Sequence, residues 1–296
     1  MQIHTVHAMI LNKLSSLYQK DEASTIAWWL LEALTQQSRI QLIAHNSVCS
    51  PEQLATINRW LDEHIHQHKP LAYIIGSVPF CDLTIMTHPP LLIPRPETEE
   101  WVQTFITNLK EKNISNFVLL DLCSGTGCIA LAVAHAFPQA TIIALDIDPQ
   151  AIACARTNAA INKITNITFI ESDLFEALQG QSFDFIVSNP PYIAHDEKLD
   201  PSITMWEAQH ALFADDKGYA IIKRIIAQAH TYLHTTNMDP AIPNLWIEIG
   251  YRQADAISAY MKEHGYDYVH CIKDYAGHDR VLCGRYVRER NTTHNS

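Results

Sequence analysis

Long apolar runs are absent from this sequence. An α-helix needs about 20 apolar residues to cross the hydrocarbon core of a bilayer, and the apolar segment 26–34 is well short of that length. The N-terminus also lacks the pattern of a secretory signal peptide. These absences predict that the protein neither crosses a membrane nor follows the secretory route. Segment 26–34 predicts the buried face of a helix.

Closely spaced cysteine pairs are absent as well. The chain contains no C-x-x-C, and its seven cysteines are Cys49, Cys81, Cys123, Cys128, Cys154, Cys271 and Cys283. Their odd number and scattered positions predict reduced thiols in an intracellular compartment. The histidines of segment 64–69 are two residues apart and would point to different sides of a helix, so we expect no metal site there.

Basic residues are few. The 296 residues include 21 Lys and Arg against 32 Asp and Glu, which gives a formal net charge of −11. Gripping a long nucleic-acid backbone takes Lys and Arg to displace counterions. The acidic balance therefore disfavours direct nucleic-acid binding and favours a protein partner or a small ligand. The length suits about two domains, and we expect a monomer.

Acidic residues are missing from residues 1–20, which contain Lys13 and Lys20. Acid-poor N-termini occur in organellar targeting segments, although this one has no arginine. The alternative interpretation is the first helix of the folded protein.

The first 97 residues predict two segments of different structure. Apolar residues at helical spacing predict a small helical domain over residues 1–70, in which Ser50 caps a helix and Pro51 lies in its first turn. Residues 71–97 are rich in β-branched residues and interrupted by glycine and proline, which predicts a β-hairpin linker. Near its end, Arg95, Glu97 and Glu99 could face a site between the domains or form an exposed salt-bridge cluster.

Residues 98–290 predict an α/β domain, followed by a disordered tail over 291–296. After a first helix, apolar strands alternate with helices and then end in two further strands, which predicts a mostly parallel sheet covered on both faces. The seven expected strands are residues 117–122, 140–147, 167–172, 183–189, 245–250, 268–274 and 280–287. Four strand ends carry polar residues: Asp121, Asp146, Asp173 and Asn189. Sheets of this kind bind ligands at that edge.

A glycine loop, "LLDLCSGTGCIALA", follows the first of these strands. Gly125, Gly127 and Ala130 satisfy G-x-G-x-x-A, so a dinucleotide or another adenosine cofactor fits the pattern. In either case Asp146, 19 residues after Gly127, is placed to bind ribose hydroxyls. A helix-entry loop with no ligand is the remaining alternative.

The third strand end adds a carboxylate in "ESDLF". Asp173 there could read an adenine amino group, with Leu174 and Phe175 flanking the ring. A helix cap for the residues that follow is the alternative interpretation of Asp173.

The segment "VSNPPYIA", residues 187–194, predicts a clamp for an NH₂ group. Amide nitrogens are poor nucleophiles, and two acceptors that hold both N–H hydrogens would turn the lone pair toward a methyl donor and stabilise the developing charge. Asn189 offers a side-chain oxygen and Pro190 a carbonyl, while neither Pro190 nor Pro191 has an N–H to compete. Tyr192 offers a flat face for a planar amide or base. A plain structural turn is the alternative.

These motifs resemble those of S-adenosylmethionine-dependent methyltransferases, and most closely the HemK/PrmC family, which methylates the glutamine of the Gly-Gly-Gln motif in class I peptide-chain release factors. The resemblance covers nearly the whole chain, through "LIPRPETEEWV", "DLCSGTGCIALA", "IIALDID", "ESDLF", "VSNPPYI" and "DYAGHDRVLCGR". It implies a Rossmann-like seven-stranded methyltransferase domain, preceded by a helical domain that docks the release factor and by the hairpin linker.

The resemblance, with the residue patterns, gives a set of expected site residues. The residues expected to bind S-adenosylmethionine are Cys123, Ser124, Gly125, Thr126, Gly127, Asp146, Asp173, Leu174 and Asn189. The residues expected to bind the substrate amide are Asn189, Pro190, Pro191 and Tyr192, of which Asn189, Pro190 and Tyr192 are the expected catalytic residues. No metal and no general base are needed, because the sulfonium is already an activated methyl donor.

Two features depart from the family pattern. Cys123 stands where the family usually has glycine, and the usual Gly-Gly turn before the fifth strand is replaced by "TTNMDPAIPN". "DLCSGTGC" and "RPETEEW" are similar to eukaryotic mitochondrial members. With the acid-poor N-terminus, this favours a mitochondrial location, and the cytoplasm is the alternative.

Three other classes of protein share part of these patterns. An adenine-N6 methyltransferase acting on DNA or RNA uses a similar clamp on a flipped base but predicts a basic face. An NAD-dependent oxidoreductase fits the glycine loop and leaves the clamp unexplained. A non-catalytic binding module would keep the sheet and lose the cofactor pocket.

Overall fold

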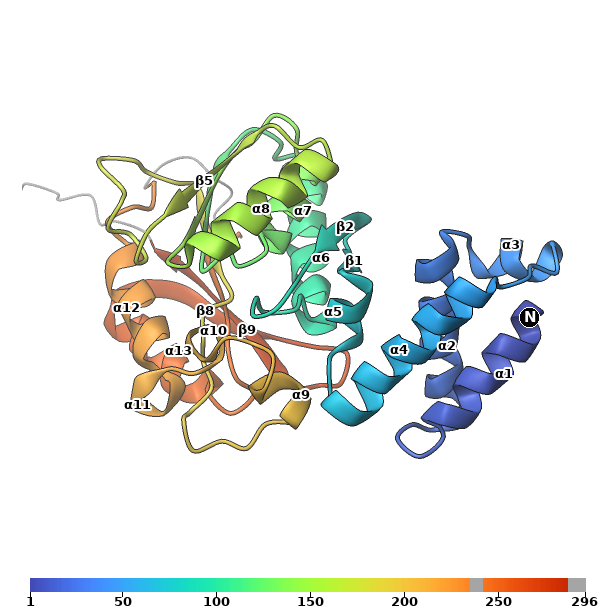
Figure 1. Cartoon of the computed structure of the whole chain (residues 1–296). Helices are drawn as coiled ribbons and strands as arrows, with labels where there is room; N and C mark the ends of the chain where they lie inside the picture. Colours follow the sequence, from blue (N-terminus) through green and yellow to red (C-terminus); the bar gives the residue numbers. More distant parts are fainter. Residues whose placement is uncertain (235–241, 287–296) are drawn as a thin grey trace, which may run out of the picture. The chain divides into compact units, whose positions relative to one another are not determined.

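The computed structural model describes residues 1–234 and 242–286 (Figure 1). The chain divides into two compact units, one formed by Met1–Ser77 with Leu199–Trp206 and the other by Val78–Lys198 with Glu207–Ser296. The tail expected over residues 291–296 lies outside the described residues.

The first unit is helical, as the periodicity predicts. Its helices are α1 (Ile3–Leu14), α2 (Lys20–Thr35), α3 (Arg39–Ala44), α4 (Pro51–Gln67), α5 (Leu71–Ile75) and α9 (Pro201–Thr204). The Ser50 hydroxyl accepts from the Gln53 N–H, and the Gln53 side chain accepts from the Ser50 N–H, so the predicted start of α4 is confirmed. Residues 3–14 form a helix whose apolar side, including Ile3 and Leu14, is fully buried in the core of this unit.

The histidine-rich end of α4 has a structural role. Nδ1 of His64 lies 2.9 Å from the carbonyl oxygen of Lys69, and Nε2 lies 2.7 Å from the Tyr18 hydroxyl. Both ring nitrogens are therefore engaged within the helical unit. Among the described residues, no group of three or more His, Cys, Asp or Glu side chains is arranged to hold a metal ion.

The hairpin expected in residues 71–97 is present but shorter, with strands β1 (Ser77–Phe80) and β2 (Leu83–Met86). Residues 71–75 form α5 instead: the Pro70 carbonyl accepts from the N–H groups of Tyr73 and Ile74 at the start of the helix, and Gly76, at φ 89°, ends it. The hairpin is fixed to helix α8 (Pro149–Ile161) by Asn158, whose side chain accepts from the Met86 N–H at 2.7 Å and donates to the Met86 carbonyl at 3.0 Å.

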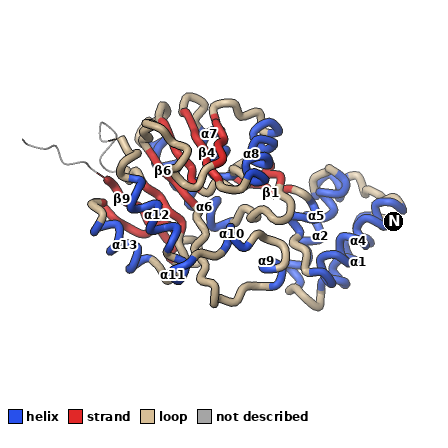
Figure 2. The backbone as a smooth tube through the Cα atoms, turned by 60° about the vertical axis from the view of Figure 1, so that its left-hand side comes forward, coloured by secondary structure: helices blue, strands red, loops and turns tan. Residues whose placement is uncertain are grey.

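A seven-stranded sheet forms the centre of the second unit (Figure 2). Its strands are β3 (Val118–Leu122), β4 (Thr141–Asp146), β5 (Ile167–Glu171), β6 (Phe185–Ser188), β7 (Leu245–Glu248), β8 (Tyr266–Lys273) and β9 (Asp279–Tyr286). The order is β5-β4-β3-β6-β7-β9-β8, in which the first five strands are parallel and β9 is antiparallel to both of its neighbours. All seven expected strands are thus present, and the predicted α/β fold is confirmed.

Helices cover both faces of this sheet. The covering helices are α6 (Pro96–Glu111), α7 (Cys128–Ala136), α8 (Pro149–Ile161), α12 (Ala220–Ala229) and α13 (Ala254–Glu263), and the short helices α10 (Gln209–Leu212) and α11 (Asp215–Gly218) lie in the chain between β6 and α12. On one face Phe105 of α6 makes edge-on contacts with Phe185 and Trp246. On the other, α12 and α13 bury Ile225 and Ile257 in one cluster with strand residues. Since residues alternate along a strand, this explains why the strands are apolar throughout.

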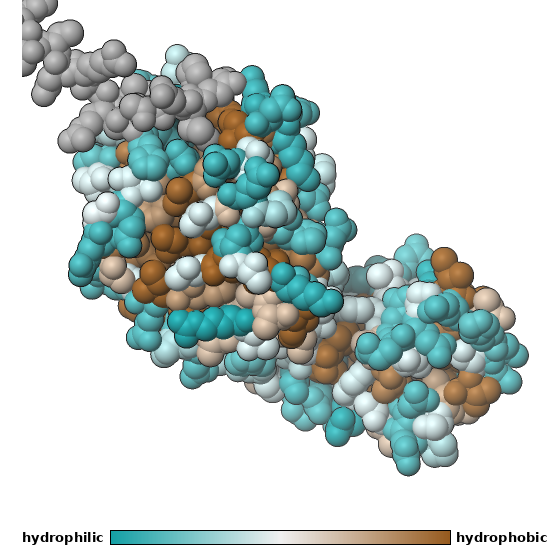
Figure 3. All heavy atoms as spheres, turned by 90° about the horizontal axis from the view of Figure 1, so that it is seen from above, coloured by the Kyte–Doolittle hydropathy of each residue, from teal (hydrophilic) through white to brown (hydrophobic). Residues whose placement is uncertain are grey.

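The surface mixes hydrophilic and hydrophobic side chains on the face drawn in Figure 3. No helix among residues 1–234 and 242–286 is long and apolar enough to span a membrane.

Candidate active site

A cavity of about 340 Å³ lies at the carboxyl ends of the parallel strands. Asp146, Asp173 and Asn189 line it together with Gly125, so three of the four polar strand ends expected at one ligand edge meet there. Asp121, at the end of β3, does not line the cavity. It is fully buried and accepts a hydrogen bond from the Ala130 N–H at 3.2 Å.

Asp146 is held by backbone groups on both oxygens. Oδ2 accepts from the Gly125 N–H at 2.7 Å, and Oδ1 accepts from the Asp148 N–H at 2.9 Å. Burial raises the pKa of Asp146, and these two hydrogen bonds oppose the shift. Because each carboxylate oxygen has lone pairs for more than one donor, Asp146 can still accept hydrogen bonds from a ligand.

The two glycines of the loop have different structural roles. Gly125 (φ 54°) lines the cavity, and a Cβ added there would meet no atom within 4 Å. Gly127 (φ 79°) does not line the cavity, and a Cβ there would lie 3.0 Å from Cβ of Ala155 and 3.2 Å from the ring of Phe169. Gly125 thus keeps room for a ligand, whereas Gly127 lets the start of α7 pack closely against α8 and β5.

Cys123 lines the cavity in a left-handed backbone conformation, φ 58°. Residues with a Cβ adopt this conformation with strain, which explains why glycine suits the position. Burial raises the pKa of its thiol, so the thiol stays protonated. Ser124 and Thr126, also expected at the cofactor, are buried and do not line the cavity.

At the third strand end, the structure brings Asp173 and Leu174 to the cavity. Asp173 does not cap a helix: its Oδ2 accepts from Nη2 of Arg224 at 3.0 Å, and Arg224 also lines the cavity. Phe175 does not flank the cavity, because its ring stacks on Tyr232 in the core at a centroid distance of 4.7 Å. The expectation that Phe175 contacts a ligand ring is therefore wrong.

The clamp segment begins with Asn189, which lines the same cavity as Gly125 and Asp146. Its Nδ2 donates to Oγ1 of Thr98 at 3.2 Å, and that hydroxyl donates to Oε2 of Glu248 at 2.7 Å. Burial raises the pKa of Glu248, and hydrogen bonds from Trp101 and Thr98 oppose the shift. Hydrogen bonds therefore link the Asn189 side chain, through the Thr98 hydroxyl, to the buried carboxylate of Glu248.

Of the other three clamp residues, only Pro191 lines the cavity. Pro190 is buried and does not line it. No hydrogen bond from the described residues ends on the Pro190 carbonyl. The Tyr192 hydroxyl donates to Oε1 of Glu248 at 3.1 Å, and burial raises the pKa of Tyr192. Tyr192 does not line the cavity, and its contact with a substrate stays a prediction.

Arg95 forms a partly buried ion pair beside the cavity. Its Nη2 lies 2.6 and 2.7 Å from the two carboxylate oxygens of Glu207. The next residue, Ala208, lines the cavity and donates its N–H to the Pro90 carbonyl at 2.7 Å. The ion pair and this hydrogen bond join two segments that border the cavity. Arg95 itself does not line the cavity, and its salt bridge is made to a buried glutamate instead of an exposed cluster.

Sequence reasoning missed several residues of the site. Ile147, His195 and Phe213 line the cavity, and Thr98 and Glu248 support Asn189. One signal was present: "LWIEIG" carries a glutamate at the end of an apolar strand. It continues the series of polar strand ends.

Comparisons with known proteins identify the family of this chain. Residues 102–215 match the family described as Methyltransferase small domain, and residues 11–76 match the one described as PrmC N-terminal domain. A Salmonella typhimurium protein named release factor glutamine methyltransferase is 35% identical over 289 residues, which cover 96% of this chain and 98% of that one. Proteins of the same name from Escherichia coli (35%, 93% and 96% covered) and Flavobacterium psychrophilum (31%, 95% and 98%) also match.

Solved structures agree on the fold. A methyltransferase from Pyrococcus furiosus has a TM-score of 0.51 at 17% identity, covering 80% of this chain and 100% of that one. A T. thermophilus 16S rRNA methyltransferase (RsmC), solved with AdoMet and guanosine, has a TM-score of 0.50 at 16% identity, covering 71% and 49%. At these identities the likeness concerns the fold alone.

The sheet order, the glycine loop at the cavity and the matched domain define a methyltransferase. An NAD-dependent oxidoreductase is thereby excluded. The chain belongs to the release factor glutamine methyltransferase family, as its identity to curated relatives over nearly its whole length shows.

Proposed function

We propose that this protein transfers the methyl group of S-adenosylmethionine to the side-chain nitrogen, N5, of the glutamine in the Gly-Gly-Gln motif of a class I peptide-chain release factor, and so supports translation termination. One observation carries the proposal. Asn189, the first residue of the clamp, lines the same cavity as Gly125 and Asp146 of the cofactor loop region. A substrate amide and a methyl donor can therefore meet in one place.

The cavity fits S-adenosylmethionine. Gly125 leaves open space where a Cβ would project, and Asp146 keeps acceptor capacity for ribose hydroxyls. Leu174 offers an apolar wall and Asp173 a carboxylate for an adenine ring. Cys123, Ser124, Thr126 and Gly127 belong to the same proposed loop, although only Cys123 among these four lines the cavity. When bound, S-adenosylmethionine supplies a methyl group on a positively charged sulfur.

The residues of the chain then act on the substrate amide. Oδ1 of Asn189 accepts one amide hydrogen and the Pro190 carbonyl accepts the other, which orients the nitrogen and stabilises positive charge on it. Neither Pro190 nor Pro191 has an N–H that could compete for these acceptors. Tyr192 packs beside the amide plane. The cavity position of Asn189 supports this assignment, and no group among the described residues donates to the Pro190 carbonyl, although Pro190 itself does not line the cavity.

The partner is a protein, and the helical residues 1–70 dock it. The match of residues 11–76 to the PrmC N-terminal domain supports a family-specific role for this unit. We also propose that the protein is monomeric, that it does not bind nucleic acid directly and that it acts in mitochondria. The low content of Lys and Arg supports the absence of nucleic-acid binding.

Mass spectrometry of a class I release factor incubated with the protein and labelled S-adenosylmethionine tests the proposed function. We expect one methyl group on the glutamine of Gly-Gly-Gln, and none when that glutamine is replaced. Transfer of label to adenine in DNA or RNA, with an unmodified release factor, would contradict the proposal and favour an adenine-N6 methyltransferase.

A further inference from the structure

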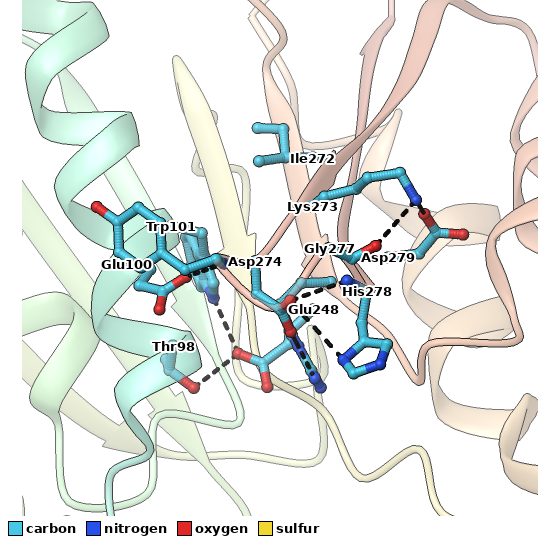
Figure 4. A network of polar contacts seen from close by, with 12 residues as sticks. Thr98, Glu100, Trp101, Glu248, Ile272, Lys273, Asp274, Gly277, His278 and Asp279 are labelled. Atoms are coloured by element: carbon cyan, nitrogen blue, oxygen red, sulfur yellow. Dashed lines mark hydrogen bonds and ion pairs between the residues drawn. The ribbon is translucent and has the colours of Figure 1, made fainter.

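A buried carboxylate, Glu248, accepts three hydrogen bonds close to the clamp. Oε2 accepts from the Thr98 hydroxyl at 2.7 Å and from Nε1 of Trp101 at 2.8 Å, and Oε1 accepts from the Tyr192 hydroxyl at 3.1 Å. Thr98 and Trp101 both come from α6 and point at Glu248 (Figure 4). Glu248 is 1% exposed, and Thr98 is also 1% exposed, so water does not substitute for these contacts.

The donors fix the direction of each hydrogen bond. An indole N–H can only donate, so Oε2 of Glu248 is an acceptor, and the Thr98 hydroxyl gives its one hydrogen to this oxygen. The Thr98 oxygen is then left as an acceptor, and Asn189 presents Nδ2 to it at 3.2 Å. With the amide turned over, Oδ1 of Asn189 would face a hydroxyl that has no hydrogen left. Oδ1 therefore points away from Thr98.

We propose that Thr98 and Glu248 are positioning residues, which keep Oδ1 of Asn189 directed to the nitrogen of the substrate amide. This inference rests on the proposed function, because it assigns a cause to the orientation of the residue that holds the substrate. Asn and Gln side chains have a nearly symmetric shape, so shape alone does not select one orientation. A directed chain of hydrogen bonds from a buried carboxylate does.

Two substitutions of Thr98 separate the hydroxyl from the shape of the side chain. Thr98→Val keeps the shape and removes the hydroxyl, and Thr98→Ser keeps the hydroxyl. With the full chain and a release factor as substrate, we expect kcat to fall about 10-fold in Thr98→Val, the scale of one lost hydrogen bond. Cofactor affinity, measured by calorimetry, should stay unchanged, and Thr98→Ser should restore most of kcat.

The Asn189→Ala background shows whether Thr98 acts through Asn189. There we expect Thr98→Val to cause no further loss of kcat, since coupled residues are not additive. Trp101→Phe is the matched control, because it removes another donor to the same oxygen of Glu248 without a contact to Asn189. It should lower thermal stability. It should leave the NMR signals of the Asn189 NH₂ group, identified by their loss in Asn189→Ala, in place, whereas Thr98→Val shifts them.

Unchanged kcat and unchanged NH₂ signals in Thr98→Val would overturn the positioning role, and so would an equal loss of kcat in the Asn189→Ala background. If Thr98→Val does not fold, Thr98→Ala, which lacks the same hydroxyl in a smaller side chain, takes its place in both measurements. A wild-type protein that leaves the release factor unmodified would instead contradict the proposed function. The NMR comparison would then decide the positioning role alone.

Discussion

The two halves of the candidate site are held in different ways. Asp146 is fixed by two backbone N–H groups. One belongs to Gly125 in the glycine loop after β3, and the other to Asp148, two residues after Asp146. Asn189 is fixed by the side chain of Thr98, which lies 91 residues earlier in the chain. Thr98 in turn is held by Glu248, 150 residues after Thr98. The cofactor half is therefore set by the path of the main chain, and the substrate half by buried side chains. Single substitutions should disturb the second half more selectively.

Asn189→Ala should have the largest effect on turnover. We expect kcat for release factor methylation to fall about 100-fold or more, the scale of losing a main charge-stabilising contact. Cofactor affinity, measured by calorimetry, should stay within a few-fold of wild type, because Asp146 and Gly125 keep their backbone contacts. Methylation at the wild-type rate would show that Asn189 is not the clamp.

Asp146→Ala should lower cofactor affinity and largely spare kcat, the reverse of Asn189→Ala. Loss of a charged acceptor for ribose hydroxyls should weaken cofactor binding by about 10- to 100-fold, as expected for hydrogen bonds to a charged group. At saturating cofactor, most of kcat should return, because Asn189 is untouched. Unaltered cofactor affinity in calorimetry would show that Asp146 does not bind the cofactor.

Acid should weaken cofactor binding earlier than it would at an exposed aspartate. Burial raises the pKa of Asp146, so on lowering the pH the carboxylate takes up a proton at a higher pH and loses acceptor capacity. Affinity should therefore be constant above this pKa and fall below it. Calorimetry from neutral pH downward measures this, and Asp146→Asn should bind weakly with no such dependence.

The nearby His210 serves as a control for this titration, since it lies 3.6 Å from Asp148 and lines the cavity. A fall in affinity that persists in Asp146→Asn would contradict the prediction, and His210→Gln shows whether the fall depends on the side chain beside Asp148.

The smallest expected effect concerns the strained loop. Cys123→Gly and Cys123→Ala both remove the thiol, but only glycine accepts φ 58° without strain. We expect Cys123→Gly to be more stable than Cys123→Ala by about 1 kcal/mol in denaturant unfolding. Equal stability would mean that the loop relaxes around a Cβ.

The same contrast explains what could be predicted from the sequence. The strands, the glycine loop and Asp146 follow from local patterns, because each depends on neighbours in the chain. The link between Thr98 and Glu248 depends on packing across α6 and β7, and no spacing in the sequence records it. Helix α5 was missed because the β-branched end of "LAYII" favours a strand, while Pro70 and Gly76 delimit a helical turn.

Residues 199–206 belong to the helical unit, although the residues before and after them in the sequence belong to the other unit. Within the helical unit, Nε1 of Trp206 donates to the Gln67 carbonyl at 3.0 Å and the Lys69 ammonium lies 5.6 Å from the indole centre. The polypeptide therefore passes between the units three times, after residues 77, 198 and 206. A single cut cannot separate them as modules, and a grafted helical unit from a relative would need its own counterpart of Trp206.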